Sequence, residues 1–87
     1  MATSTQYEIE TLRAIWAKAQ IDQNNDRNIF RKDSYGTWIK WSEYGQTTQY
    51  GWEVDHILPV ARGGSDALSN LQPLQWENNR KKSDNPW

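Results

Sequence analysis

The absence of cysteine is the feature that most limits how this chain can fold. Its 87 residues allow one domain, and domains of this size often need a disulfide or a bound metal to support a small core. With no cysteine and one histidine, neither a disulfide nor a zinc site built on cysteine pairs is available. The chain must therefore be stabilised by packing, and its six Trp and four Tyr supply large apolar side chains.

The first twenty residues predict a helix preceded by a loose tail at residues 1–4. Thr5 and Glu8 have the spacing of a capping box, with Thr5 as the N-cap. Apolar residues then recur at helical spacing, namely Ile9, Leu12, Ile15, Trp16 and Ala19. We therefore expect a helix over residues 6–20 whose apolar face packs on the core, followed by a polar loop at residues 22–26.

The next part of the chain predicts a short β-hairpin. Residues 37–41 alternate like a strand, and they follow a glycine-containing turn at residues 34–36. Residues 49–55 form the next expected strand, which would pair with residues 37–41 over a long polar loop. Residues 29–31 read as a further short extended piece.

The only histidine lies next to an aspartate in Trp52-Glu-Val-Asp-His-Ile-Leu-Pro59. The apolar residues of this stretch predict a strand that Pro59 ends, and that brings Asp55 and His56 to one rim of a sheet. Because Asp55 and His56 are adjacent, a regular strand would point them to opposite faces. The two can share one site only if the strand ends or bulges at that point. Alternatively, they act from the two sides of the strand.

The residues after this strand predict a loop, a strand and a helix. Residues 61–70 are a long loop that Gly63 and Gly64 open, and Ser65 or Asp66 caps one helical turn at residues 66–69. Residues 71–75 then form an edge strand, because Pro73 cannot donate a backbone hydrogen bond. Residues 76–83 form a short helix that Pro86 stops.

Four motifs in this half of the chain occur in order: Asp-His-Ile-x-Pro, Gly-Gly-Ser-Asp, Asn-Leu-Gln-x-Leu and Asn-x-x-Lys-Ser. They cover residues 52–85 and resemble an HNH endonuclease, and the last motif is similar to the HNH domain of RNA-guided CRISPR effectors. The resemblance implies a ββα-metal core. With the N-terminal helix and the hairpin before it, we expect an α+β fold in a single domain over residues 1–87. It implies hydrolysis of DNA to 5′-phosphate and 3′-hydroxyl ends, with RNA left open as a substrate.

The resemblance also assigns roles to three residues. His56 would be the general base, because a histidine side chain titrates near neutral pH and can accept a proton from water. Asp55 and Asn79 would hold Mg²⁺ or Mn²⁺, since both ions prefer oxygen ligands. The metal would lie between the strand and the helix, or share one side with His56. Many family members have histidine at the position of Asn79, so asparagine here should make zinc bind less well.

Other residues of the motifs are expected to support this site. Asn70 would close the loop through side-chain bonds to the backbone, with Gly63 and Gly64 as turn residues. The positive charges within the motif region would contact phosphate or lie on a solvated face; they are Arg62, Arg80 and Lys82. Glu53 would be a salt-bridge partner rather than a metal ligand.

The formal net charge of −1 argues mildly against avid non-specific DNA binding. It keeps open a catalytically silent nucleic-acid-binding module. A toxin-type nuclease domain is a third possibility, and an immunity or packaging protein remains open as a partner. No stretch approaches the ~18 apolar residues of a membrane span, and no signal peptide is evident. We therefore expect a cytoplasmic protein of a bacterium or a virus, with no membrane partner.

Overall fold

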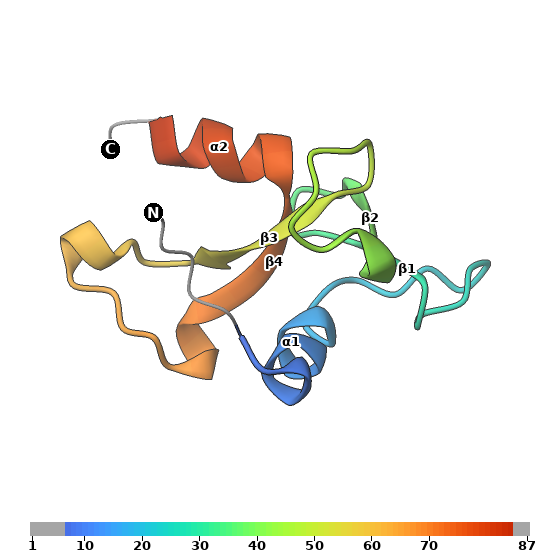
Figure 1. Cartoon of the computed structure of the whole chain (residues 1–87), viewed down its shortest axis with the longest axis horizontal. Coiled ribbons are helices and arrows are strands. Elements are labelled where there is room, and N and C mark those ends of the chain that lie inside the picture. The colour runs from blue at the N-terminus through green and yellow to red at the C-terminus, as the bar shows by residue number, and fades with distance from the viewer. Residues whose placement is uncertain (1–6, 85–87) are drawn as a thin grey trace.

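A computed structural model describes residues 7–84 of the chain. Figure 1 shows an α+β fold, as the sequence predicts, in which two short antiparallel β-ribbons lie among two helices. The elements in chain order are α1 (Ile9–Trp16), β1 (Phe30–Lys32), β2 (Trp38–Lys40), β3 (Trp52–His56), β4 (Leu71–Gln75) and α2 (Trp76–Asp84). Three 3₁₀ turns connect them, at Trp41–Glu43, Val60–Arg62 and Leu68–Asn70.

The β3–β4 ribbon lies between the two helices, with α1 below it and α2 above it in Figure 1. Its strands pair without interruption from Trp52 opposite Gln75 to His56 opposite Leu71. Side chains therefore alternate strictly between the two faces. Trp52 and Val54 pack toward α1, whereas Glu53 and Asp55 contact side chains of α2. This ββα unit agrees with the core that the sequence motifs predict.

The core between α1 and the ribbon is largely aromatic. Trp52 is fully buried, and the Trp16, Trp41 and Tyr44 rings have centroids 5.3, 5.9 and 4.9 Å from it. The Nε1–H of Trp52 donates to the carbonyl oxygen of Lys40 at 2.9 Å, so its one polar atom is satisfied inside the core. Tilted and edge-on ring pairs of this kind add about 0.5–1.5 kcal/mol each beyond area burial.

The first helix is shorter than residues 6–20. It begins at Ile9 with Glu8 at the N-cap, and the side chain of Glu8 makes no capping hydrogen bond. Thr5 and the predicted tail at residues 1–4 lie outside the described residues. The helix ends at Trp16 because the chain then tightens into a turn and Gln20 pairs with Lys32 as an isolated β-bridge.

The first hairpin differs from the predicted one in its partner strand. Residues 38–40 pair with residues 30–32, and residues 52–56 pair with β4 instead. The turn between β1 and β2 explains this choice. One carboxylate oxygen of Asp33 accepts the backbone N–H groups of Tyr35 and Thr37, and Gly36 adopts a left-handed φ of 85°. This local closure stabilises the pairing of residues 30–32 with residues 38–40.

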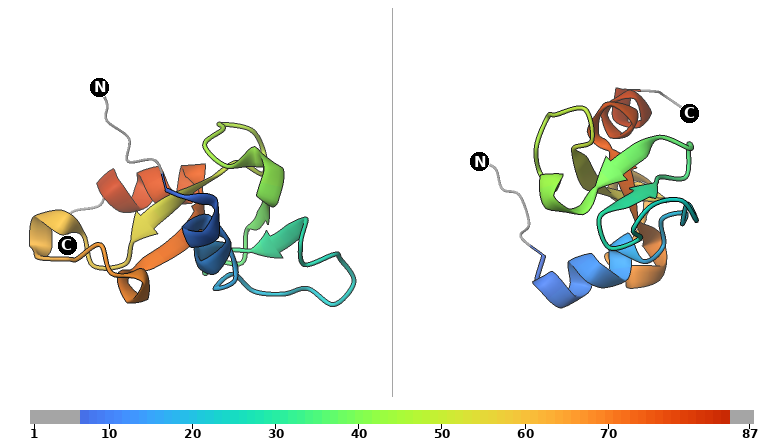
Figure 2. Two further views of the ribbon diagram at one scale, coloured as in Figure 1. Left: turned by 60° about the horizontal axis from the view of Figure 1, so that its bottom comes forward. Right: turned by 90° about the vertical axis from the view of Figure 1, so that its right-hand side faces the viewer.

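Asp33 also joins this hairpin to the ribbon and to α2. It is fully buried, and its second carboxylate oxygen accepts the backbone N–H of Gln75 and the Nδ2 of Asn78, each at 2.9 Å. Gln75 ends β4 and Asn78 lies in the first turn of α2. The right-hand view of Figure 2 shows the hairpin between the levels of α1 and α2. Asp33 therefore fixes where α2 begins.

Among residues 7–84, no helix is both long and apolar enough to span a membrane.

Candidate active site

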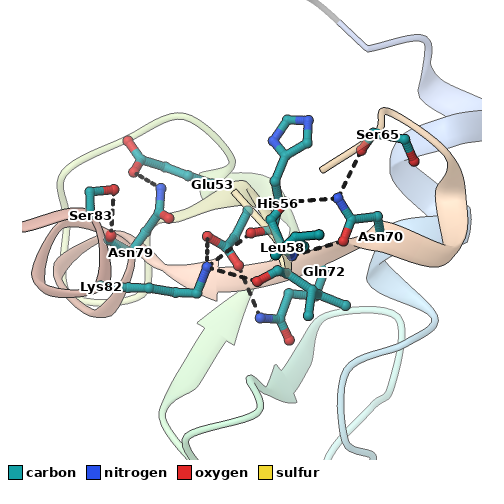
Figure 3. A network of polar contacts seen from close by, with 11 residues as sticks. Glu53, His56, Leu58, Ser65, Asn70, Gln72, Asn79, Lys82 and Ser83 are labelled. Carbon is teal, nitrogen blue, oxygen red and sulfur yellow. Dashed lines mark hydrogen bonds and ion pairs between the residues drawn. The ribbon is translucent and has the colours of Figure 1, made fainter. Parts of the chain in front are cut away.

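Asp55 and His56 lie on opposite faces of β3. The strand remains paired through His56 and Leu71, so it neither ends nor bulges at Asp55. In Figure 3 the ring of His56 points away from Lys82 and Gln72, which are the two side chains that contact Asp55. This is the second of the two arrangements that the sequence left open. Asp55 faces α2, and the side chain of His56 lies on the other side of the ribbon.

The carboxylate of Asp55 is buried, at 6% exposure, and two side chains neutralise and orient it. Lys82 Nζ lies 3.1 Å from its Oδ1, and Gln72 Nε2 donates to its Oδ2 at 3.0 Å. The Lys82 ammonium also donates to the carbonyl oxygens of His56 and Ile57, at 2.9 and 3.3 Å. Lys82 therefore lies inside the site, with only 17% of its side chain exposed, instead of extending into solvent.

Asn79 lies beside this pair on α2 and contacts Glu53. Its Nδ2 donates to Glu53 Oε1 at 2.8 Å, so the amide oxygen of Asn79 points elsewhere. Glu53 precedes Asp55 by two residues and Asn79 precedes Lys82 by three, so each pair shares one face of its element. Figure 3 shows the Glu53–Asn79 contact on the same side of the ribbon as Lys82. Two carboxylates and one amide thus line the surface between β3 and α2.

The positive charges of this region differ in their surroundings. Arg80 extends along the outside of α2, where it pairs with Glu53 at 3.2 Å and lies over the Trp76 ring at 5.1 Å. Arg62 lies in the exposed 3₁₀ turn after β3. Lys82 is the partly buried one of the three. Arg62 and Arg80 are therefore better placed than Lys82 to meet a ligand from solvent.

Asn70 joins the two ends of the long loop. Its Oδ1 accepts the Leu58 N–H at 2.8 Å, and its Nδ2 donates to the carbonyl oxygens of Leu58 and Ser65 at 3.0 and 2.8 Å. Gly63 has a left-handed φ of 92°. Gly64 is required for a different reason, because a Cβ there would lie 1.7 Å from the Leu58 carbonyl oxygen. The loop is thus closed by contacts that few other residues allow.

This closed loop brings Asp66 to His56. The Nε2 of His56 lies 2.7 Å from Asp66 Oδ1, and 87% of the Asp66 side chain is exposed. Asp66 also faces the start of α1, where burial and then the charge of Asp66 raise the pKa of Tyr7. Tyr44 packs against the same core, and burial, Tyr7 and then Glu53 raise its pKa. Acidic groups on β3 and on the loop therefore raise the pKa values of two tyrosines beside the core.

The sequence did not indicate four of these features: the inward position of Lys82, the contact of Asp66 with His56, the contact of Asn79 with Glu53, and the hydrogen bonds by which Asp33 joins the first hairpin to β4 and α2. Alternation along β3 would have placed Glu53 with Asp55, and Asp33-x-x-Gly36 is a turn signal. The other contacts depend on how the loop and α2 fold back, which local patterns do not encode.

The donor set on the α2 face is compatible with a hard cation. Within residues 7–84, no three side chains from His, Cys, Asp and Glu gather into a possible metal site. The oxygen donors that this face offers are the carboxylates of Asp55 and Glu53 and the amide oxygen of Asn79. Oxygen ligands of this kind suit Mg²⁺ or Mn²⁺ and do not favour zinc.

A family model described as HNH endonuclease matches residues 44–87, which is half of the chain and includes β3, the long loop, β4 and α2. No curated protein and no solved structure matches the chain.

Proposed function

Because the chain belongs to the HNH endonuclease family, we propose that it hydrolyses phosphodiester bonds of DNA with the help of a divalent metal ion. The observation that carries this proposal is the arrangement at the end of β3. An acidic, oxygen-rich face lies between β3 and α2. His56, the only histidine of the chain, is adjacent to Asp55 and extends from the opposite face of β3. The products would be 5′-phosphate and 3′-hydroxyl ends.

Asp55 and Asn79 are the residues that would hold Mg²⁺ or Mn²⁺, with Glu53 as a further oxygen donor. The fit rests on donor chemistry, because all three offer hard oxygens from one side of the ribbon. A bound ion would stabilise negative charge on the scissile phosphate and on the leaving 3′ oxygen. If Asp55 held a metal ion, Lys82 would still have two carbonyl acceptors, those of His56 and Ile57. Its ammonium would then remain at the end of the strand.

His56 would act as the general base by taking a proton from the attacking water. Along Glu53–His56, β3 pairs only with β4 within residues 7–84, so no strand covers its other edge. A phosphate that approaches this edge lies within reach of both faces of the strand. This route lets His56 and Asp55 act on one phosphodiester although their side chains diverge. Arg62 and Arg80 would attract the DNA backbone toward the same region.

The direct experiment is cleavage of supercoiled plasmid with Mg²⁺ and with EDTA. We expect nicked or linear product only with the metal, and an at least tenfold slower reaction for Asp55→Ala, since removal of groups around a metal costs 10–100-fold. Asp26→Ala is the matched control, because Asp26 is an exposed loop residue whose carboxylate accepts the N–H of Asn28 in its own turn. DNA binding without any cleavage by the wild-type chain would instead support the silent binding module and refute the proposal.

A further inference from the structure

We propose that Asp66 is a positioning residue that holds the imidazole of His56 with its proton on Nε2, so that Nδ1 is the nitrogen that accepts the proton from water. The inference rests on the proposed function for its catalytic consequence. The placement of the proton itself is a property of the folded chain and can be measured without DNA.

The contact between the two side chains determines which nitrogen carries the proton. His56 Nε2 and Asp66 Oδ1 are 2.7 Å apart, a distance typical of a charge-assisted hydrogen bond. A carboxylate has only acceptor sites, so Nε2 must donate. A neutral imidazole carries one N–H, which leaves Nδ1 with its lone pair exposed for proton transfer.

Asp66 can fix the ring because its backbone is anchored, although its side chain is exposed. Asn70 bonds to the carbonyl oxygen of Ser65, the residue before Asp66, and the hydroxyl of Ser65 accepts the N–H of Ala67, the residue after it. From the turn that follows α1, Lys18 donates to the carbonyl oxygens of Leu68 and Leu71 and holds the end of the loop. The loop therefore presents Asp66 to His56 from a closed frame, and the turn after α1 takes part in building that frame.

This arrangement assigns a role to the loop beyond its own closure. The face of the ribbon opposite the metal ligands would orient the base, while the α2 face would bind the ion. Two separate sets of contacts would thus prepare the two halves of the reaction. Loss of Asp66 should affect the base and leave metal binding unchanged.

The test uses the fact that the chain has a single histidine, so one imidazole accounts for the whole spectrum of a tag-free sample. We would record two-bond ¹H–¹⁵N correlations of the 87-residue chain at a pH at which the spectrum itself shows a neutral ring. We expect protonated Nε2 and bare Nδ1 in the wild type and in Asp66→Asn, whose amide oxygen still accepts. Asp66→Ala should shift both nitrogens toward the averaged values of a free imidazole. Asp26→Ala, a loop change away from the histidine, should match the wild type.

Single-turnover cleavage then tests the catalytic consequence. Asp66→Ala should be about tenfold slower, the lower end of what loss of an orienting partner costs, while Asp66→Asn should stay close to the wild type and thermal unfolding should be unchanged. A spectrum of Asp66→Ala identical to the wild-type spectrum would overturn the inference. So would a shifted spectrum with an unchanged rate. If the wild-type chain cleaves no DNA, the proposed function fails, and the spectrum still decides where the proton lies.

Discussion

Replacing Asp33 with Asn tests how the N-terminal hairpin supports the candidate active site. The two carboxylate oxygens of Asp33 accept four hydrogen bonds, from Tyr35, Thr37, Gln75 and Asn78, while the residue is fully buried. The side-chain amide of Asn has only one acceptor oxygen. Its NH₂ group would therefore face two N–H donors, either those of Tyr35 and Thr37 or those of Gln75 and Asn78. If the oxygen stays on the local turn, the lost bonds are those to Gln75 and Asn78.

The expected loss of stability follows from these two bonds. Hydrogen bonds to a charged acceptor contribute about 1.5–3 kcal/mol each, and unpaired buried donors cost a similar amount. Asp33→Asn should therefore lower the free energy of unfolding by roughly 3–6 kcal/mol, a large part of the ~5–15 kcal/mol typical of a small domain. Because Asn78 adjoins Asn79, the change should also weaken the placement of the proposed metal ligand.

Urea unfolding followed by tryptophan fluorescence measures this effect, with the slope of the transition compared between variants. Asp26→Asn is the matched control. Asp26 is exposed and its Oδ1 accepts the N–H of Asn28, which an amide oxygen can replace, so its effect should stay within about 0.5 kcal/mol. Removal of Asn78 in the Asp33→Asn background should cost less than in the wild type, because the two side chains interact. If Asp33→Asn is as stable as Asp26→Asn, the hydrogen bonds of Asp33 to Gln75 and Asn78 do not hold the hairpin to α2.

Three further results are expected. Asn79→His should keep activity with Mn²⁺, Ni²⁺ or Co²⁺ and lose it with Mg²⁺, because an imidazole nitrogen suits the softer ions better; a uniform loss across the metals would show that Asn79 is not a ligand. With no cysteine and one histidine, the chain should unfold cooperatively on heating in EDTA, and a chain that folds only when zinc is added would contradict this. Burial, then Tyr7 and Glu53, raise the pKa of Tyr44, so the unfolded chain ionises first and stability should fall as pH rises above about 10. Tyr44→Phe should reduce that fall in urea titrations at successive pH values, and an unchanged slope would refute the assignment.

The part of the fold that the sequence predicts well is the part whose signals are local. Pro59 marks the end of β3, Pro73 marks β4 as an edge strand, and α2 follows directly. The hairpin prediction was wrong because residues 37–41 have two possible partners, and alternation does not distinguish them. Asp33 and Gly36 select the nearer partner through the chemistry of the turn.

The candidate site could be predicted only as a set of residues, not as an arrangement. Alternation implied that Asp55 and His56 diverge, yet the continuous pairing of β3 was needed to choose between the two alternatives. The inward position of Lys82 depends on how α2 packs across β3. The contact of Asp66 with His56 depends on a loop that Asn70 closes from its own end and Lys18 holds from outside it. Each of these is a long-range contact, and no periodic pattern in the chain encodes it.

The most direct test of the proposed mechanism is single-turnover DNA cleavage by His56→Ala with Mg²⁺. The substitution removes the proposed base and neither proposed metal ligand. The rate should therefore fall by at least about 10²-fold, the lower end for loss of a general base, while Mn²⁺ binding measured by calorimetry should match the wild type. A variant that cleaves at the wild-type rate would show that His56 is not the base.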